Sequence, residues 1–296
     1  MTLTDGYHQP VMVDEAVGLL NIRPAGNYID ATAGGGGYTV IIASQLGPSG
    51  RLLAIDRDVE AVEQTRERNR ELLSHVDITQ GNFSDMANLA STVGITAIDG
   101  VVFDLGVSGH QFDCAERGFS YRQDGPLDFR MDRSQGLTAA DIINNYPQEK
   151  LNNIFYTLGE EKNARRIASV ISNSRTKKEI TTTFELVKII KSVTNPRYLN
   201  KTLSRCFQAI RIVVNEEIES LNKGLQVAIG LLAPAGRIVV LSYHSLEDRL
   251  VKNIFRERKQ NGDLQILTKK PLIAKDQEKD SNPRSRSVKL RAAEKI

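Results

Sequence analysis

Three aspartates close predicted strands, and the first of them precedes a run of four glycines. Asp30 is followed by Gly34 to Gly37, while Asp56 and Asp104 each end a short apolar segment further along the chain. Glycine lets a backbone turn sharply and approach a ligand closely. A carboxylate at a strand end accepts hydrogen bonds from a ribose or an amine. The pattern therefore predicts a nucleoside site at the carboxyl ends of parallel strands.

Two nucleotide cofactors compete for this loop. A dinucleotide site requires Gly-x-Gly-x-x-Gly, with a helix N-terminus on the pyrophosphate. Gly34 and Gly36 fit the first two places, but Thr39 occupies the third. S-adenosylmethionine has no phosphate and carries an amine and a sulfonium, which an acid such as Asp30 suits better. Asp56 suits the ribose of either cofactor. S-adenosylmethionine is favoured, and a nucleotide-dependent oxidoreductase is the alternative.

The elements that position these residues alternate between strand and helix in the first half of the chain. Short apolar strands are predicted at residues 28–31, 51–56, 77–80 and 100–104. Between 138 and about 215 the periodicity is helical, with helices predicted at 139–145, 149–156, 162–173 and 183–191. A helix at 216–232, a strand at 237–242, a helix at 246–259 and weaker strands at 265–267 and 286–290 follow. We predict one doubly wound α/β sheet with a helical insertion.

Composition excludes several other classes of protein. With 40% hydrophobic and 25% charged residues among 296, the chain can bury a sizeable core and is not a disordered protein. Cys114 and Cys206 are the only cysteines, so neither a disulfide framework nor a zinc site is expected, and no metal is predicted. We find neither a signal-peptide core nor a stretch of membrane-spanning length, and expect a cytoplasmic protein.

Longer motifs extend over almost the whole chain. They lie at residues 7–12, 30–38, 53–58, 104–108, 116–121, 124–132, 207–211, 242–249 and 282–287. The stretch from Glu116 to Asp132 is the most distinctive of them. From near His8 to near Glu294, the sequence resembles the bacterial 16S ribosomal RNA cytosine-N4 methyltransferases of the MraW type.

This resemblance implies a fold, a substrate and a partner. The fold is the class I methyltransferase Rossmann-like sheet with an inserted all-helical domain. Residues 1–112 and 213–296 would form the S-adenosylmethionine domain, and 113–212 a helical domain for RNA recognition. The substrate would be the N4 amine of a cytidine in the decoding region of 16S rRNA, within the small ribosomal subunit. Neither DNA nor a membrane is expected as a partner, and a homodimer is among the oligomeric states that the sequence allows.

The resemblance also implies which residues contact the cofactor. They are Gly36, Gly37, Tyr38, Asp56, Phe83, Asp104 and Gln111. We expect the Phe83 ring to lie against the adenine. Tyr38 stands where the family commonly has His, but a backbone amide or an aromatic face can serve there. The 201–203 segment, Lys-Thr-Leu, replaces a frequent His-Pro-Ala run, and Gly109-His110 replaces a more usual pair that contains Ser.

Methylation of a cytosine amine sets its own chemical demands. The amine is a weak nucleophile because its lone pair is delocalised into the ring, whereas a sulfonium is a good leaving group. The site must align nitrogen, carbon and sulfur, exclude water and accept an N–H hydrogen bond. Asp104 is the first candidate for that acceptor and His244 the second, with water as a third. For His244, a structural role in the core is an equally good interpretation.

Entry of the base and binding of the RNA would need aromatic and cationic side chains. Candidate aromatic residues near the site are Phe119, Tyr121 and Tyr243. The loop cations Arg117, Arg122 and Arg130 suit an RNA-facing loop, or a loop tied together by Asp124, Asp128 and Asp132. Further candidate phosphate contacts are Arg205, Arg211, Arg284, Arg286, Lys289 and Arg291. We expect the charged segment 274–282 to be mobile. A non-enzymatic RNA-binding or assembly module that kept a cofactor fold is the remaining alternative.

Overall fold

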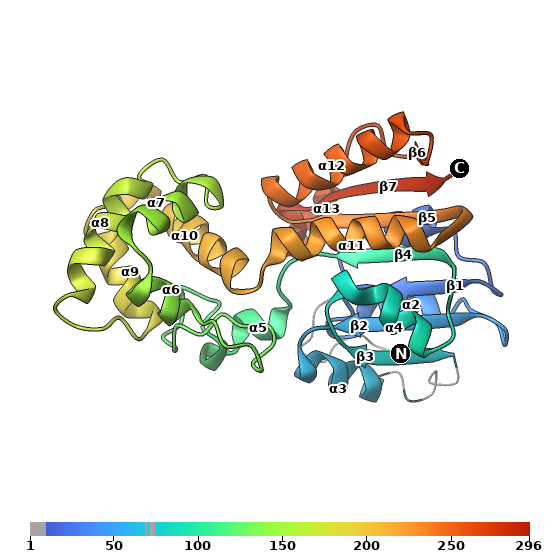
Figure 1. The fold of residues 1–296 in the computed structure, drawn as a ribbon, viewed down its shortest axis with the longest axis horizontal. Coiled ribbons are helices and arrows are strands. Elements are labelled where there is room, and N and C mark those ends of the chain that lie inside the picture. The colour runs from blue at the N-terminus through green and yellow to red at the C-terminus, as the bar shows by residue number, and fades with distance from the viewer. Residues whose placement is uncertain (1–9, 69, 71–74) are drawn as a thin grey trace. The chain divides into compact units, whose positions relative to one another are not determined.

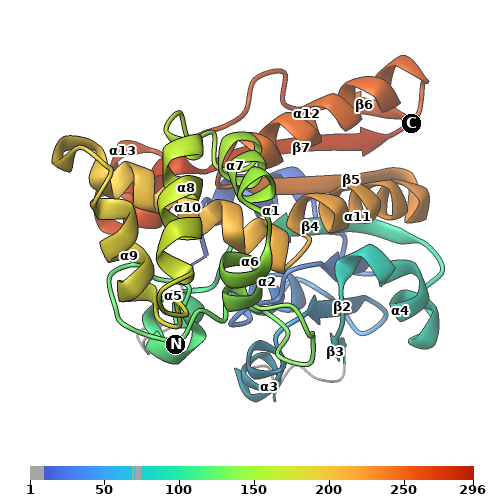
Figure 2. The same ribbon diagram turned by 60° about the vertical axis from the view of Figure 1, so that its left-hand side comes forward.

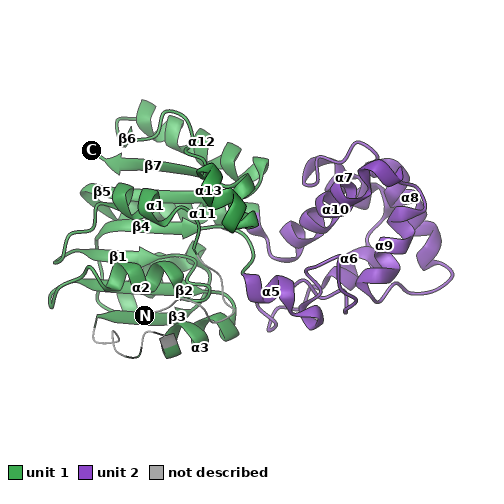
Figure 3. Cartoon of the chain, turned by 180° about the vertical axis from the view of Figure 1, so that it is seen from behind, with its two compact units in different colours: residues 1–108, 218–296 green, residues 109–217 purple. Residues whose placement is uncertain are grey.

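The computed structural model describes residues 10–68, 70 and 75–296. The chain forms two compact units, one of residues 1–108 with 218–296 and one of residues 109–217 (Figure 3). The domain limits expected from the sequence, at 112 and 213, fall a few residues inside the second unit. The start of the first family-like motif, residues 7–9, lies outside the described residues.

The first unit is built on a seven-stranded sheet with the order β3-β2-β1-β4-β5-β7-β6 (Figure 1). Its strands are β1 (Asn27–Asp30), β2 (Arg51–Asp56), β3 (Val76–Gln80), β4 (Ile98–Asp104), β5 (Leu232–Ser242), β6 (Leu264–Ile266) and β7 (Lys289–Lys295). The pairs among β1 to β5 are parallel, and β7 runs antiparallel between β5 and β6. This order confirms the predicted doubly wound sheet.

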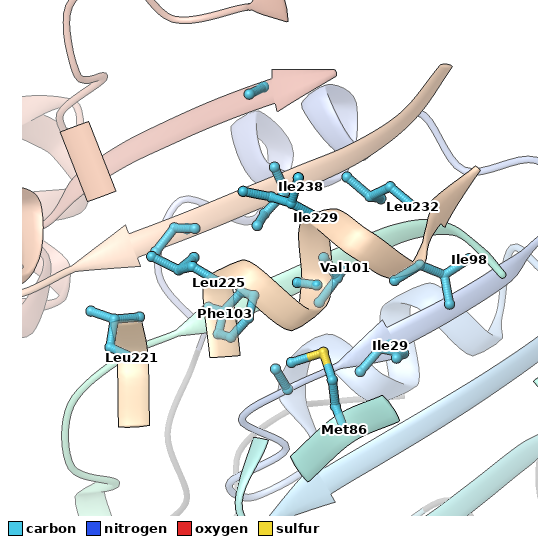
Figure 4. Packing of buried hydrophobic residues seen from close by; sticks show 14 of the residues in the cluster. Ile29, Met86, Ile98, Val101, Phe103, Leu221, Leu225, Ile229, Leu232 and Ile238 are labelled. Atoms are coloured by element: carbon cyan, nitrogen blue, oxygen red, sulfur yellow. The ribbon is translucent and has the colours of Figure 1, made fainter. Parts of the chain in front are cut away.

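Helices cover both faces of this sheet. They are α1 (Val13–Leu20), α2 (Gly37–Ala43), α3 (Val59–Arg68), α4 (Met86–Thr92), α11 (Glu217–Leu231), α12 (Ser245–Gln260) and α13 (Asp276–Ser281). Successive side chains of a strand point to opposite faces. Phe103 of β4 therefore packs with α4, α11 and α12, while Val102 packs with α1, α2 and α3. Figure 4 shows Phe103 beside Leu225 of α11 in the first of these cores.

The second unit is helical throughout its regular elements (Figure 2). It contains α5 (Gly109–Asp113), α6 (Ala139–Asn145), α7 (Gln148–Thr157), α8 (Ala164–Arg175), α9 (Thr183–Lys191), α10 (Leu199–Val214) and the 3₁₀ turns η3 (Ala115–Arg117) and η4 (Pro196–Tyr198). The central helix, α10, packs against α6, α7 and α9. Thr138 and Thr182 begin α6 and α9 with capping boxes, which explains why both helices start where the sequence predicted.

Two predictions near the C-terminus are wrong. Strand β7 begins at Lys289 rather than at residue 286, because the Asn282 side chain caps a 3₁₀ turn that opens with Pro283. The segment predicted to be mobile instead forms α13, with Ala274 buried beside it. Glu278 of α13 accepts a hydrogen bond from the Met12 amide at 2.7 Å. None of the helices in the described part of the chain combines the length and the apolarity needed to cross a membrane.

Candidate functional site

The three strand-end aspartates, Asp30, Asp56 and Asp104, lie together at the carboxyl ends of the parallel strands in the first unit. We call this end of the sheet the acidic edge. Asp56, Asp30 and Asp104 end β2, β1 and β4, which are consecutive strands in the sheet. The chain reverses its winding direction between β1 and β4, so Asp30 and Asp104 flank the switch point. Ligands of doubly wound sheets bind outside the carboxyl ends of strands at such a point. The topology therefore brings together the acids that the sequence singled out.

Asp56 fixes the glycine loop. One of its carboxylate oxygens accepts from the Gly34 amide at 2.7 Å, and the other accepts from the Asp58 amide at 2.9 Å. Gly34 and Gly36 have φ angles of 52° and 80°, which residues with a Cβ rarely adopt. Gly36 directly precedes α2, and the Thr65 hydroxyl of α3 donates to the Gly34 carbonyl at 2.9 Å. These hydrogen bonds fix the conformation of the loop, whose four glycines carry no side chain.

Asp30 is fully buried beneath this loop. Its carboxylate accepts from the Thr32 amide at 3.2 Å and from the Thr39 hydroxyl at 2.6 Å. Thr39 occupies the place where a dinucleotide motif has its third glycine, and here it ties the first turn of α2 to β1. Asp30 therefore anchors the loop, whereas the sequence suggested that this acid meets the cofactor amine.

The electrostatics of this edge favour a cationic ligand. Burial raises the pKa of Asp30 and of Asp56 to about 6, and the Asp56 charge adds to the effect on Asp30. Burial, together with the nearby charges of Asp30 and Glu247, raises the pKa of Asp104 to about 7. A positive charge among these carboxylates would relieve this cost and lower all three pKa values. The same edge repels a pyrophosphate.

Asp104 has a partner that the sequence did not reveal. The Tyr243 hydroxyl donates to Asp104 Oδ1 at 2.6 Å, and the Asp104 amide donates to the Thr32 hydroxyl at 2.6 Å. Tyr243 is the first residue after β5, which pairs with β4 so that Leu241 lies opposite Asp104. A sequence signal did exist, because parallel pairing of two strands brings the residues that follow them to one edge.

His244 is the N-cap of α12. Its Nδ1 accepts from the Glu247 amide at 3.4 Å, and its Nε2 lies 3.2 Å from Glu247 Oε1. Glu247 reaches back to accept from the His244 amide at 3.3 Å, which completes a capping box, and it also accepts from the Tyr243 amide at 2.8 Å. The side chain of His244 is 8% exposed. His244 thus makes the structural contact that one of the two interpretations allowed, and its part in catalysis stays a prediction.

The remaining expected cofactor residues have different surroundings. Tyr38 is buried, and its hydroxyl donates to the Val11 carbonyl. The half-buried Phe83 packs edge-on against Phe103, with ring centroids 5.5 Å apart. Its ring also contacts Gly224 of α11, where a Cβ would come within 2.6 Å. Gly37 lies against Pro10, and Gln111 is buried in α5 of the second unit.

Part of the expected RNA-facing loop is buried in the second unit. Arg117 is 1% exposed and donates to the carbonyls of Arg130 and Met131. Arg130 pairs with Asp128 at 2.8 Å, and Phe119 stacks on Phe129 inside the core. The loop is therefore tied together internally, and of its three arginines Arg122 alone is exposed. Four other expected phosphate contacts are also engaged, in the ion pairs Arg205–Glu161, Arg211–Glu217, Lys289–Asp248 and Arg291–Asp248.

Sequence comparisons with known proteins match almost the whole chain. A sequence model described as the MraW methylase family matches residues 5–296. A protein of Bacteroides fragilis named ribosomal RNA small subunit methyltransferase H is 45% identical, over 98% of this chain and 97% of its own. One of the same name from Pelobacter propionicus is 44% identical, over 98% of each. An O-methyltransferase from Bacillus cereus, solved in complex with SAH, is 9% identical, with a TM-score of 0.45 over 97% of this chain and 83% of that one.

Proposed function

The chain belongs to the MraW methylase family, and from that premise we propose that it methylates small-subunit ribosomal RNA. The donor is S-adenosylmethionine, and the acceptor is the exocyclic N4 of a cytidine in the decoding region of 16S rRNA. The observation that carries the proposal is Asp104, a carboxylate oriented at the switch point beside two further acids and a glycine loop.

The residues at the edge fit this donor. Asp56 keeps a lone pair for the ribose hydroxyls, because a carboxylate accepts about four hydrogen bonds and the amides of Gly34, Arg57 and Asp58 do not use them all. Gly36 and Gly37 bring backbone close to the methionine part, with Tyr38 beneath them. Phe83 borders the adenine, and we assign Gln111 as a further contact. When bound, S-adenosylmethionine supplies an electrophilic methyl group and a cationic sulfur, which the acidic edge favours.

Asp104 orients the nucleophile. Bound S-adenosylmethionine would give its methyl carbon to the amine nitrogen, and its sulfur would keep the electron pair of the broken carbon–sulfur bond. A hydrogen bond from the amine N–H to Asp104 localises the nitrogen lone pair as this bond forms. The proton then leaves the nitrogen to Asp104 or to water. With its pKa raised to about 7, Asp104 is a better proton acceptor than an ordinary aspartate and is still half ionised at neutral pH.

The helical unit supplies the positive charge that RNA requires. Residues 162–205 contain eleven Lys and Arg against two Glu. On α9, Phe184, Lys188 and Lys191 are exposed at the helical spacing i, i+4, i+7, which places them on one face. The exposed Tyr198 lies under the Arg197 guanidinium, 5.6 Å from its ring centroid. Cations interleaved with exposed aromatic rings suit single-stranded RNA.

The two alternative functions are less well supported. An oxidoreductase that uses a dinucleotide needs an anion site, whereas this edge gathers carboxylates whose pKa values are already raised. Titration with S-adenosylmethionine and with NAD separates these ligands. A non-enzymatic RNA-binding module needs no acceptor at Asp104. Loss of methyl transfer in Asp104→Ala, with RNA binding retained, would rule out the hypothesis of a module that only binds RNA.

The deciding experiment uses small ribosomal subunits from a strain that lacks this protein. They are incubated with the enzyme and methyl-labelled S-adenosylmethionine, and the RNA is digested and mapped by mass spectrometry. We expect one labelled N4-methylcytidine in the decoding region. Label on protein, on another nucleoside or on no nucleoside would overturn the proposal. Protein-free 16S rRNA in a parallel reaction tells whether the assembled subunit is required.

A further inference from the structure

Tyr243 is held as firmly as the carboxylate that it contacts. Its ring packs against Gly106, where an added Cβ would lie 3.3 Å from Tyr243 Cδ2. Gly106 has a φ of 110°, so the chain after β4 bends in a conformation that leaves room for this ring. The Tyr243 amide is fixed by Glu247 at 2.8 Å. Packing and backbone thus direct the phenol at Asp104 before any substrate is bound.

The phenol acts on one oxygen of the carboxylate. It donates to Asp104 Oδ1 at 2.6 Å, and within the described parts of the chain Oδ2 receives no hydrogen bond. A carboxylate on a strand end rotates about its terminal torsion, which is broad and soft. A short hydrogen bond to a neutral donor removes this freedom and stabilises the charged form.

We propose that Tyr243 is the positioning residue of the methyl transfer. It holds Asp104 Oδ1 so that the carboxylate stays ionised and its Oδ2 stays open to the amine. The inference rests on the proposed function, in which Asp104 accepts from the cytosine N–H. Tyr243 touches neither the amine nor the methyl group. It acts through Asp104, and a phenylalanine in its place would fill the same volume without the donor.

The charges around Asp104 make the effect of this donor large. Asp30 on β1 and Glu247 on α12 both disfavour the ionised form, and burial does so more strongly. Burial raises the pKa of Tyr38 on α2, and the nearby charge of Asp104 raises it further. Tyr243 is the group that lowers the pKa of Asp104, against all of these. The pKa of Tyr243 itself is raised by burial and by Asp104, so the phenol keeps its proton and remains a donor.

The pH profile of methyl transfer tests this role in Tyr243→Phe. Loss of the donor raises the pKa of Asp104, and we expect the acid limb of kcat/KM for S-adenosylmethionine, which reports the free enzyme, to move up by about one unit. Activity at pH 7 then falls about fivefold and recovers at pH 9, where Asp104 is ionised in both proteins. Tyr28→Phe is the matched control. It removes another phenol of the first unit, which accepts from the Arg23 amide at 2.7 Å, away from Asp104.

A second measurement does not depend on activity. Titration of ¹³C-labelled aspartate carboxyls by NMR, with the Asp104 signal assigned from Asp104→Asn, reports the pKa directly in the cofactor-free protein. We expect a higher midpoint in Tyr243→Phe and the wild-type midpoint in Tyr28→Phe. An unchanged midpoint, or a kcat/KM lowered equally at every pH, would overturn the role of Tyr243. Failure of the wild-type protein to methylate RNA would instead overturn the proposed function. The titration would still decide whether Tyr243 lowers the pKa of Asp104.

Discussion

The acidic edge of the first unit and the Lys- and Arg-rich helices within residues 162–205 of the second unit, here called the basic helices, use charge in opposite ways. At the edge, Asp30 and Asp56 are each locked by two hydrogen bonds to the glycine loop or its neighbours. On α9, Lys188 and Lys191 extend from an exposed helix face. Fixed, buried charges orient a reacting group, whereas exposed charges attract a polyanion over a distance and at little cost.

The composition of the two units follows the same division. Residues 109–217 hold 17 Lys and Arg against 13 Asp and Glu, whereas the rest of the chain holds 22 against 23. The modest net charge of +3 for the whole chain hides this difference. We therefore expect single substitutions at the acidic edge to change methyl transfer or cofactor affinity strongly. Substitutions of single cations on the helices of the second unit should each change RNA affinity by a small amount.

The largest effect is expected for Asp104→Asn. The amide keeps the shape of the side chain, but it is a much poorer acceptor for the amine proton, so methyl transfer should fall by about 10²- to 10⁴-fold. Single-turnover methylation of small subunits measures this loss, and calorimetry of S-adenosylmethionine binding serves as the control. A variant that keeps more than about a tenth of the wild-type rate would show that water, and not Asp104, is the acceptor.

A smaller loss is expected for Asp56→Asn, and it should appear in cofactor binding. The carboxylate is assigned to the ribose hydroxyls, and hydrogen bonds to a charged group contribute about 1.5–3 kcal/mol. The Kd for S-adenosylmethionine should therefore rise by about 10- to 100-fold, while the Kd for RNA stays the same. Calorimetry for the cofactor and filter binding for the RNA separate the two. An unchanged cofactor affinity would show that the ribose does not bind at the end of β2.

Local signals were enough to predict the edge. Asp30, Asp56 and Asp104 each end an apolar run, and the glycines mark the turn after the first of them. Parallel strands must place their carboxyl ends together, so the sequence predicted the acids and their shared edge without knowledge of any long-range contact. The capping threonines Thr138 and Thr182 likewise marked the starts of α6 and α9.

Contacts between distant residues were beyond the same reasoning. Tyr243 lies 139 positions from Asp104, and their pairing depends on the register of β4 against β5. Arg117 looked like an RNA contact because composition does not reveal burial, and its partners are backbone carbonyls that any residue offers. His244 was left open because histidine is an uncommon N-cap, so its box with Glu247 was not recognised.

On the basic helices, Lys188→Glu combined with Lys191→Glu should weaken RNA binding by about tenfold at moderate salt, because each cation neutralises a phosphate. The slope of log Kd against log salt should become shallower by about 1.4, as expected for two lost contacts to single-stranded RNA. Arg256→Glu with Lys259→Glu, two exposed cations at the end of α12, makes the same charge change on the first unit. Equal weakening in both pairs would mean that net charge, and not the α9 face, holds the RNA.

The last effect concerns the stability of the cofactor-free protein, and it is opposite in sign to the effect on function. Asp30 is fully buried, and its pKa of about 6 lies above the value in an unfolded chain. The folded state therefore binds the proton more tightly, so ionisation costs stability as pH rises from about 4 to about 6, and the cost stays constant above that. Asn at this position keeps an acceptor for Thr32 and avoids the charge.

Asp30→Asn should consequently be more stable than wild type by up to about 3 kcal/mol at pH 8, with the difference vanishing near pH 4. Urea unfolding across this pH range measures it. The same substitution removes one of the three negative charges that favour a sulfonium, so cofactor affinity should fall as stability rises. A gain in stability that is independent of pH would show that the cost lies in packing at β1 and not in the buried charge. The acidic edge would then have been built without the electrostatic strain that distinguishes it from the basic helices.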